Sequence, residues 1–225
     1  LTGTNLTGVT AVTVGGSAAT SIRSNTSTSV TFNTPSGTAG AKDVVVTTAA
    51  GSVTSANAFT YVAPVTITYD TNTATSGSPS RSSDLYTPNS GGYALPTVGT
   101  MVKTGHTFSG WTTVFDSTTA LTSPYNPSTS KTLYAIWTAR DYTITYNANG
   151  ATSGSAPSAS LNTYGSSVNL ADNTGGSALV RTGYTLTGWL INGTLYNINA
   201  NGAFNMPAEN LIAYANWQIN TYSVT

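Results

Sequence analysis

The sequence predicts an all-β protein made of small modules arranged in a row. Segments of alternating apolar and polar residues indicate half-buried strands, most clearly "VTITY" at 65–69 and "YTITY" at 142–146. Turn-forming phrases such as "NANG" and "NSGG" lie between such segments. No stretch has the capped amphipathic pattern of a long helix, and the best helical candidate is a short turn at 207–210, "PAEN".

Phrases that occur twice at nearly constant spacing predict a tandem duplication. "TGHTFSGW" at 104–111 returns as "TGYTLTGW" at 182–189, and "LYAIW" at 133–137 returns as "AYANW" at 213–217. The offsets from one copy to the next are 77 to 80 residues. Self-similarity at a fixed period indicates repeated structural modules, each with its own core.

The repeats divide the chain into three predicted modules and a short remainder. Residues 1–62 lack the repeated phrases and form a separate unit, 63–139 form the first repeat, and 140–219 form the second repeat. Residues 220–225 match the start of a further repeat, and an exchanged strand that pairs with a neighbouring molecule is the alternative. The joints "AP" and "TARD" are very short, which favours a stiff arrangement.

The first unit resembles the IPT/TIG family of immunoglobulin-like domains. The matching phrases are "LTGTNLTG" at 1–8, "VTVGGSAAT" at 12–20, the Val-rich segment that ends at Gly51, and "AFTYV" at 58–62. This resemblance implies an immunoglobulin-like β-sandwich. The unit is shorter than a full sandwich of about 100 residues, so we expect the first strand to be missing and the chain to be an internal or processed fragment.

The two later units resemble the Listeria–Bacteroides repeat of internalin-type bacterial surface proteins. The matching pattern is an opening "ITYDTN" or "ITYNANG", then "TG-aromatic-T-x-x-GW" after Lys103 or Arg181, then a closing "LYAIW" or "AYANW". The first copy departs from this pattern, because His106 stands at the aromatic position. The resemblance implies small, mostly β, β-grasp-like modules, a place in extracellular stalks and adhesins, and no catalytic residues.

The composition argues against several classes of function. Only 6% of the residues are charged, against about 25% in an average protein, and seven cations balance seven anions. Seven scattered cations form no basic patch for nucleic acid, and no apolar run is long enough for membrane insertion. Because the chain has no cysteine, disulfides and Cys-based metal sites are excluded. We expect no cofactor.

The single histidine and the dispersed acids make weak catalytic candidates. His106 is matched by Tyr184 in the second repeat, which favours a packing role over general-base catalysis. The seven acids are spread along the chain, and Asp70 is matched by Asn147. The segment that starts at Asp70 resembles a calcium loop only superficially, since it lacks the bidentate acid such loops require. We therefore predict neither a catalytic nor a metal site.

The four tryptophans leave two interpretations open. Each recurs at a fixed place in a repeat, and a small module has few other large residues for its core, so a core role is favoured. The alternative is that Trp111 and Trp189 stack on sugars. We expect Gly110 and Gly188 to bend or bulge a strand so that the tryptophan after each turns inward.

Three sequons mark candidate glycosylation sites, at Asn5, Asn25 and Asn192. Chance alone produces several sequons in a chain rich in Asn, Ser and Thr, so they do not identify a modified residue.

The sequence as a whole predicts a structural stalk or adhesin segment of a bacterial cell-surface or extracellular fibre protein, not an enzyme. It would act as a rigid multi-domain spacer or assemble into a filament. The expected partners are copies of itself or neighbouring domains of the same long chain, with a host or environmental glycan or protein as a further partner. The alternative is a set of non-catalytic carbohydrate-binding or accessory modules of a secreted polysaccharide-active enzyme.

Overall fold

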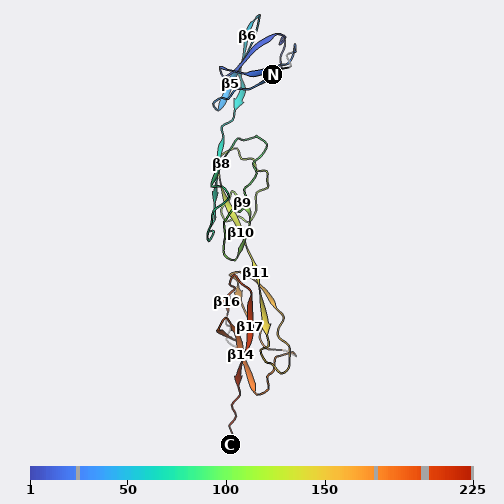
Figure 1. Ribbon diagram of the computed structural model, residues 1–225, viewed down its shortest axis with the longest axis vertical. Coiled ribbons are helices and arrows are strands. Elements are labelled where there is room, and N and C mark those ends of the chain that lie inside the picture. The colour runs from blue at the N-terminus through green and yellow to red at the C-terminus, as the bar shows by residue number, and fades with distance from the viewer. Residues whose placement is uncertain (24–25, 175–176, 199–202, 224–225) are drawn as a thin grey trace. The chain divides into compact units, whose positions relative to one another are not determined.

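The structure, a computed structural model, describes residues 1–23, 26–174, 177–198 and 203–223 (Figure 1). Its strands are β1 Val9–Val14, β2 Ser17–Ala18, β3 Thr20–Arg23, β4 Thr31–Asn33, β5 Gly40–Thr48, β6 Gly51–Tyr61, β7 Val65–Asp70, β8 Ser83–Tyr86, β9 His106–Thr112, β10 Lys131–Ala139, β11 Asp141–Asn147, β12 Ser160–Thr163, β13 Ser167–Val168, β14 Tyr184–Ile191, β15 Thr194–Asn197, β16 Phe204–Asn205 and β17 Leu211–Ile219. The described ranges contain no helix, and the all-β prediction is confirmed.

The helical turn predicted at 207–210 is wrong. The segment forms a bend between β16 and β17, which leave it only the five residues from 206 to 210. So short a segment cannot offset the cost of helix nucleation. The side chain of Asn210 instead accepts a hydrogen bond from the Thr143 N–H at 2.9 Å, which ties the bend to β11.

Each sheet lies within one of the three ranges that the repeats predict. The strand orders are β2-β1-β5-β6 and β3-β4 in the first range, β8-β7-β10-β9 in the second, and β12-β11-β17-β14-β15 and β13-β16 in the third. Backbone proximity groups the chain into two compact units, residues 1–68 with 83–95 and 122–132, and residues 69–82 with 96–121 and 133–225. The three-module division stays a prediction, and the sheets are described one by one.

The first range buries a valine-rich core between its two sheets. Val12 and Val14 on β1 and Val44 and Val46 on β5 alternate with more exposed neighbours, as the period of two requires. Strands β1 and β5 pair antiparallel, and Val12 lies opposite Val46. Seven buried side chains make up the core: Leu6, Val9, Val12, Val14, Val30, Val44 and Val46. This arrangement agrees with the immunoglobulin-like fold expected from the sequence.

In each repeat, the first and last long strands lie next to each other in the sheet. In the second repeat β11 and β17 are parallel, and Ile144 lies opposite Leu211. The antiparallel strands β12 and β14 flank this pair. Ile144 and Ala213 are fully buried, which explains why the "ITY" and "AYANW" phrases must recur together.

A β-bulge precedes each Gly-Trp pair, as predicted. On β9, Phe108 and Gly110 pair with consecutive residues of β10, so Ser109 is the extra residue. On β14, Thr187 is the extra residue in the same way. Residues three apart in a regular strand point to opposite faces. The extra residue reverses this parity, so that Phe108 joins Trp111, and Leu186 joins Trp189, on the core side.

A second pair of glycines lets two irregular segments of each repeat approach each other closely. Gly77 and Gly154 belong to the phrase "TSGS", which also occurs once in each repeat. Both have left-handed backbones, with φ of 79° and 85°. A Cβ would lie 2.0 Å from the Thr100 oxygen at Gly77 and 2.1 Å from the Ala178 oxygen at Gly154. Only glycine allows so close an approach of two backbones.

Residues 221–223 lie after the last strand and are exposed, and Tyr222 retains 81% of its accessible surface. Residues 224 and 225 lie outside the described residues. Whether 220–225 begin a further repeat or exchange with a neighbour therefore stays a prediction.

The contact at Gly154 predicts a large cost for any side chain at that position. Gly154→Ala adds a clash with a backbone carbonyl to the strain of a left-handed alanine, so we expect about 3 kcal/mol of destabilisation of the second repeat. Gly193→Ala is the matched control, because Gly193 has a φ of 81° and open space where a Cβ would lie. It should cost about 1 kcal/mol. Urea unfolding followed by the Trp189 indole N–H signal measures both, and equal costs would contradict the prediction.

Candidate functional site

The two Gly-Trp tryptophans form the centres of the two repeat cores. Trp111 and Trp189 have exposed fractions of 1% and 0%. Their indole N–H groups donate to the Pro96 oxygen at 2.8 Å and the Ala171 oxygen at 2.7 Å. A tyrosine of the first strand packs against each ring, Tyr69 on Trp111 and Tyr146 on Trp189, with centroids 5.0 and 4.8 Å apart. These indoles present no free ring face, so the sugar-stacking alternative does not apply to them as they lie here.

The other two tryptophans are half-buried and lie on the core face of each sheet, where Trp137 is opposite Phe108 and Trp217 is opposite Leu186. Trp137 donates its N–H to the Thr71 oxygen at 3.0 Å, and Trp217 donates to the Ala148 oxygen at 3.3 Å. Phe108 packs edge-on against Trp137 with the centroids 5.7 Å apart. Part of each side chain stays accessible, so these two tryptophans retain some exposed aromatic surface.

The segment that starts at Asp70 is a turn motif. The Asp70 carboxylate accepts the Asn72 N–H at 2.7 Å, and the Asn147 amide oxygen accepts the Asn149 N–H at 2.8 Å. Asn72 and Asn149 have positive φ, and each side-chain amide donates to an oxygen of the last strand at 2.8 Å. Asp and Asn serve equally as acceptors in such a turn, which explains the exchange between the repeats.

His106 packs against an aromatic ring, and six of the seven acids are exposed. The His106 ring packs edge-on against Tyr164, and its Nδ1 lies 2.8 Å from the Thr104 oxygen. Among the acids, Asp43, Asp70, Asp116, Asp141, Asp172 and Glu209 are exposed. Asp84 is half-buried and accepts a hydrogen bond from the Tyr93 hydroxyl. In the described part of the chain no three His, Cys, Asp or Glu residues lie close enough to hold a metal ion.

Tyr125 has a shifted pKa. Burial raises the pKa of the Tyr125 phenol above its ordinary value, because desolvation disfavours the charged phenolate. Its backbone pairs with that of Tyr93, with N–O distances of 2.6 and 2.9 Å. The neutral phenol therefore belongs to the packing of an irregular segment.

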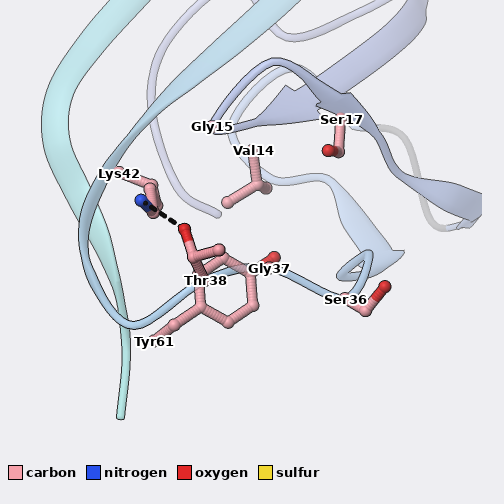
Figure 2. Close-up of a pocket in the computed structure, with 8 residues that line it drawn as sticks. All are labelled: Val14, Gly15, Ser17, Ser36, Gly37, Thr38, Lys42 and Tyr61. Atoms are coloured by element: carbon pink, nitrogen blue, oxygen red, sulfur yellow. Dashed lines mark hydrogen bonds between the residues drawn. The ribbon is translucent and has the colours of Figure 1, made fainter. Parts of the chain in front are cut away.

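A hollow of about 430 Å³ opens on the first domain (Figure 2). Gly15, Gly37 and Thr38 line it together with Lys42 and Tyr61. The Lys42 amine donates to the Thr38 hydroxyl at 3.0 Å, and the Tyr61 hydroxyl donates to the Pro35 oxygen at 2.5 Å. A Cβ at Gly37 would lie 2.4 Å from the Tyr61 ring. Tyr61, on β6, thus holds the loop that contains Pro35 and Gly37, and Lys42 is the one charged group in the lining.

A second hollow, of about 370 Å³, lies on the first repeat and has a different lining. Trp137 and the 57% exposed Phe115 supply aromatic surface, and Asp116 and Lys103 supply charge. The Lys103 amine donates to the Thr73 hydroxyl at 2.9 Å. Ring faces beside hydrogen-bonding groups suit a neutral polar ligand such as a sugar. Sequence reasoning missed this hollow, since Phe115 lies in a segment without a repeated phrase.

Two of the three predicted glycosylation acceptors are described. Asn5 and Asn192 are both exposed, in turns with φ of 58° and 46°. Asn192 and Gly193 form the two-residue turn between β14 and β15, and the Asn192 amide donates to Glu209 at 3.3 Å. Asn25 lies outside the described residues. Glycosylation stays a prediction at all three.

The comparisons with known proteins identify the modules. The model of the Listeria-Bacteroides repeat domain matches residues 65–136 and 142–216, and the model of the IPT/TIG domain matches residues 1–61. Both matches confirm the resemblances drawn from the sequence. No solved structure matches the chain significantly.

Two curated relatives come from Evansella cellulosilytica. One, named a putative Gly-rich membrane protein, is 37% identical over 139 residues, which cover 56% of this chain and 16% of the relative. The other, named a putative membrane protein, is 33% identical over 126 residues, or 52% of this chain and 18% of the relative. The chain thus spans less than a fifth of either protein. In the part of the chain that the structure describes, no helix is long and apolar enough to cross a membrane.

The burial of Trp189 predicts that its removal unfolds the second repeat. Trp189→Ala deletes a fully buried ring and its hydrogen bond, a loss of about 3–5 kcal/mol. Such a loss is comparable to the whole stability of a small module. Ile212→Ala serves as control, since Ile212 is 49% exposed on the neighbouring β17 and should cost under about 1 kcal/mol. Heteronuclear NMR spectra of both variants provide the measurement. A folded Trp189→Ala repeat would contradict the core assignment.

Proposed function

We propose that this chain, which belongs to the Listeria-Bacteroides repeat domain family, is a structural spacer in a bacterial cell-surface protein. IPT/TIG domains and Listeria-Bacteroides repeats fit a surface or extracellular multi-domain protein. The two relatives that align with about half of this chain are named membrane proteins. A spacer exposed outside the cell would account for modules that each have their own core and carry few charges.

The main support is the joint between the repeats, where one residue separates two sheets. β10 ends at Ala139 and β11 begins at Asp141, so Arg140 alone connects them. Its N–H donates to the Gly105 oxygen at 2.8 Å, and its C=O accepts the Tyr164 N–H at 2.8 Å. A linker with both backbone groups bonded to ordered segments has little conformational freedom. A spacer needs a joint that moves little, and the restricted backbone of Arg140 suits this role.

The surface chemistry also supports an exposed structural role. Serine and threonine hydroxyls on neighbouring strands bond to each other, as Thr68 does with Thr132 at 3.0 Å and Thr47 with Ser52 at 2.9 Å. These contacts carry no charge, so salt and pH within the ordinary range alter them little. Such a surface would keep its structure in a variable external medium.

Antibody access on intact bacteria that make the full-length protein tests the spacer role. Deletion of residues 140–219 joins Ala139 to Asn220, the counterpart of Arg140, and shortens the row by one repeat in register. We expect residues 1–62 to be labelled on intact cells. An epitope on the side of the deletion that faces away from the envelope should lose labelling, because it then lies closer to the envelope. Immunoblots of whole cells control for the amount of protein. Labelling that requires permeabilised cells would contradict the proposal.

A carbohydrate-binding role is the second candidate, and the hollow on the first repeat favours it. Phe115 and Trp137 present aromatic surface there. Trp111 and Trp189, the stacking residues suggested by the sequence, are buried. Stacking on a half-exposed ring and bonds to Asp116 and Lys103 would bind a neutral oligosaccharide weakly.

Glycan-array binding distinguishes the two candidates. If the hollow binds sugar, Phe115→Ala should lower affinity at least about tenfold, the usual effect of losing one aromatic contact worth about 1.4 kcal/mol. Val114→Ala is the matched control, since Val114 is 63% exposed beside Phe115 and lies outside the lining. Equal binding by both variants, or binding by neither the native chain nor its variants, would contradict a sugar site here.

A further inference from the structure

The Thr-Gly-aromatic turn has the same geometry in both repeats. Gly105 and Gly183 have φ of 70° and 78°. The Gly105 oxygen accepts the Arg140 N–H at 2.8 Å, and the Gly183 oxygen accepts the Asn220 N–H at 2.9 Å. In both repeats the residue after the glycine donates its N–H to the residue three before it, at 3.0 Å. The two turns are therefore equivalent surfaces.

The surroundings of the two turns differ in one respect. The Tyr164 ring lies directly over Gly105, where a Cβ would come within 2.3 Å of it, and packs edge-on against His106 at 5.4 Å. Gly105 is buried as a result. Gly183 is exposed, and a Cβ there would meet no atom within 4 Å. The second turn thus offers the surface that the first has filled.

Backbone pairing between β11 and β12 positions Tyr164 over Gly105. Asp141 pairs with Thr163, and the next residue along, Tyr164, donates its N–H to the Arg140 oxygen at 2.8 Å. Arg140 is bonded to Gly105 at the same time. Gly105 and Tyr164 lie in the same compact unit. Residues 220–223, "NTYS", correspond to 140–143, "RDYT", so a repeat joined in this register would bring its own tyrosine to Gly183.

The first repeat carries no tyrosine at this position. Thr66 pairs with Leu85, and Thr143 pairs with Leu161, so Pro88 corresponds to Tyr164. The first repeat follows a domain that lacks the Thr-Gly-aromatic phrase. The tyrosine is therefore present in the repeat that follows such a turn and absent from the repeat that does not.

We propose that the Thr182-Gly183-Tyr184 turn is a docking surface for the tyrosine of a further repeat joined at Asn220, which would lie over Gly183 as Tyr164 lies over Gly105. The glycine is required because the incoming ring occupies the space of its side chain. The aromatic residue after it provides an edge-on ring contact. This contact concerns how repeats join one another, and it holds whether or not the chain acts as a spacer.

Amide hydrogen exchange in the native chain provides the first test. Arg140 and Asn220 make equivalent hydrogen bonds, but only Arg140 lies under a docked tyrosine, so its protection factor should be at least about tenfold higher. Tyr164→Ser should reduce the protection of Arg140 to the level of Asn220. Gly105→Ala should do the same, whereas Gly183→Ala, at a similar φ, should leave Arg140 unchanged. Trp111 and Trp189 indole signals confirm that the repeats stay folded.

A chain in which residues 141–219 are repeated directly after Asn220 provides the second test. The added copy should raise the protection of Asn220 at least about tenfold, and Gly183→Ala should abolish this gain. Replacing the added tyrosine by serine should abolish it too. Equal protection of Arg140 and Asn220 in the native chain would overturn the proposal. A gain at Asn220 that persists without the added tyrosine would overturn it as well.

Discussion

The hydrogen bond from a buried indole N–H to an irregular segment organises each repeat. In both repeats the ring fills the core, and its N–H donates to a backbone oxygen outside the sheet, Pro96 in one and Ala171 in the other. A buried N–H without a partner would cost about 1–3 kcal/mol. The hydrogen bond therefore holds the Pro96 or Ala171 carbonyl in position beside the ring. The long connection between the first and second halves of the sheet is thereby fixed over the core.

The bulge before each tryptophan follows from the same constraint. Two large side chains three residues apart must both face the core, and a regular strand does not allow this. One extra residue restores the parity, and the glycine after it permits the local backbone. At Gly188 a Cβ would lie 2.2 Å from the Tyr196 oxygen, so the hairpin strand β15 also requires this glycine. The Gly-Trp phrase is repeated because each core needs the ring and the bulge together.

The sequence predicted the strands, the repeats and the bulges because these depend on local patterns. Period-two alternation located β7 and β11, and the recurrence of Trp189 in the pattern indicated a core role. Contacts between distant residues were less accessible. The "TSGS" glycines were missed although they recur, because their role appears only where Gly154 meets the Ala178 oxygen. Phe115 and Tyr164 were missed because neither recurs in the other repeat, and a comparison of repeats cannot reveal a residue present in one copy.

A comparison of the two repeats distinguishes residues that stabilise a single repeat from residues that contact the neighbouring repeat. Asp70 becomes Asn147 and the turn bond persists, and Phe108 becomes Leu186 while the core contact remains. At such positions the contact is kept while the side chain varies, so the contact is what the module requires. Pro88 and Tyr164 behave differently, since the change of residue adds a contact to the preceding repeat. A module stable by itself has no need of that contact, because its core is complete without it. The residue therefore serves the connection between modules, which is the property that matters in a chain of repeats.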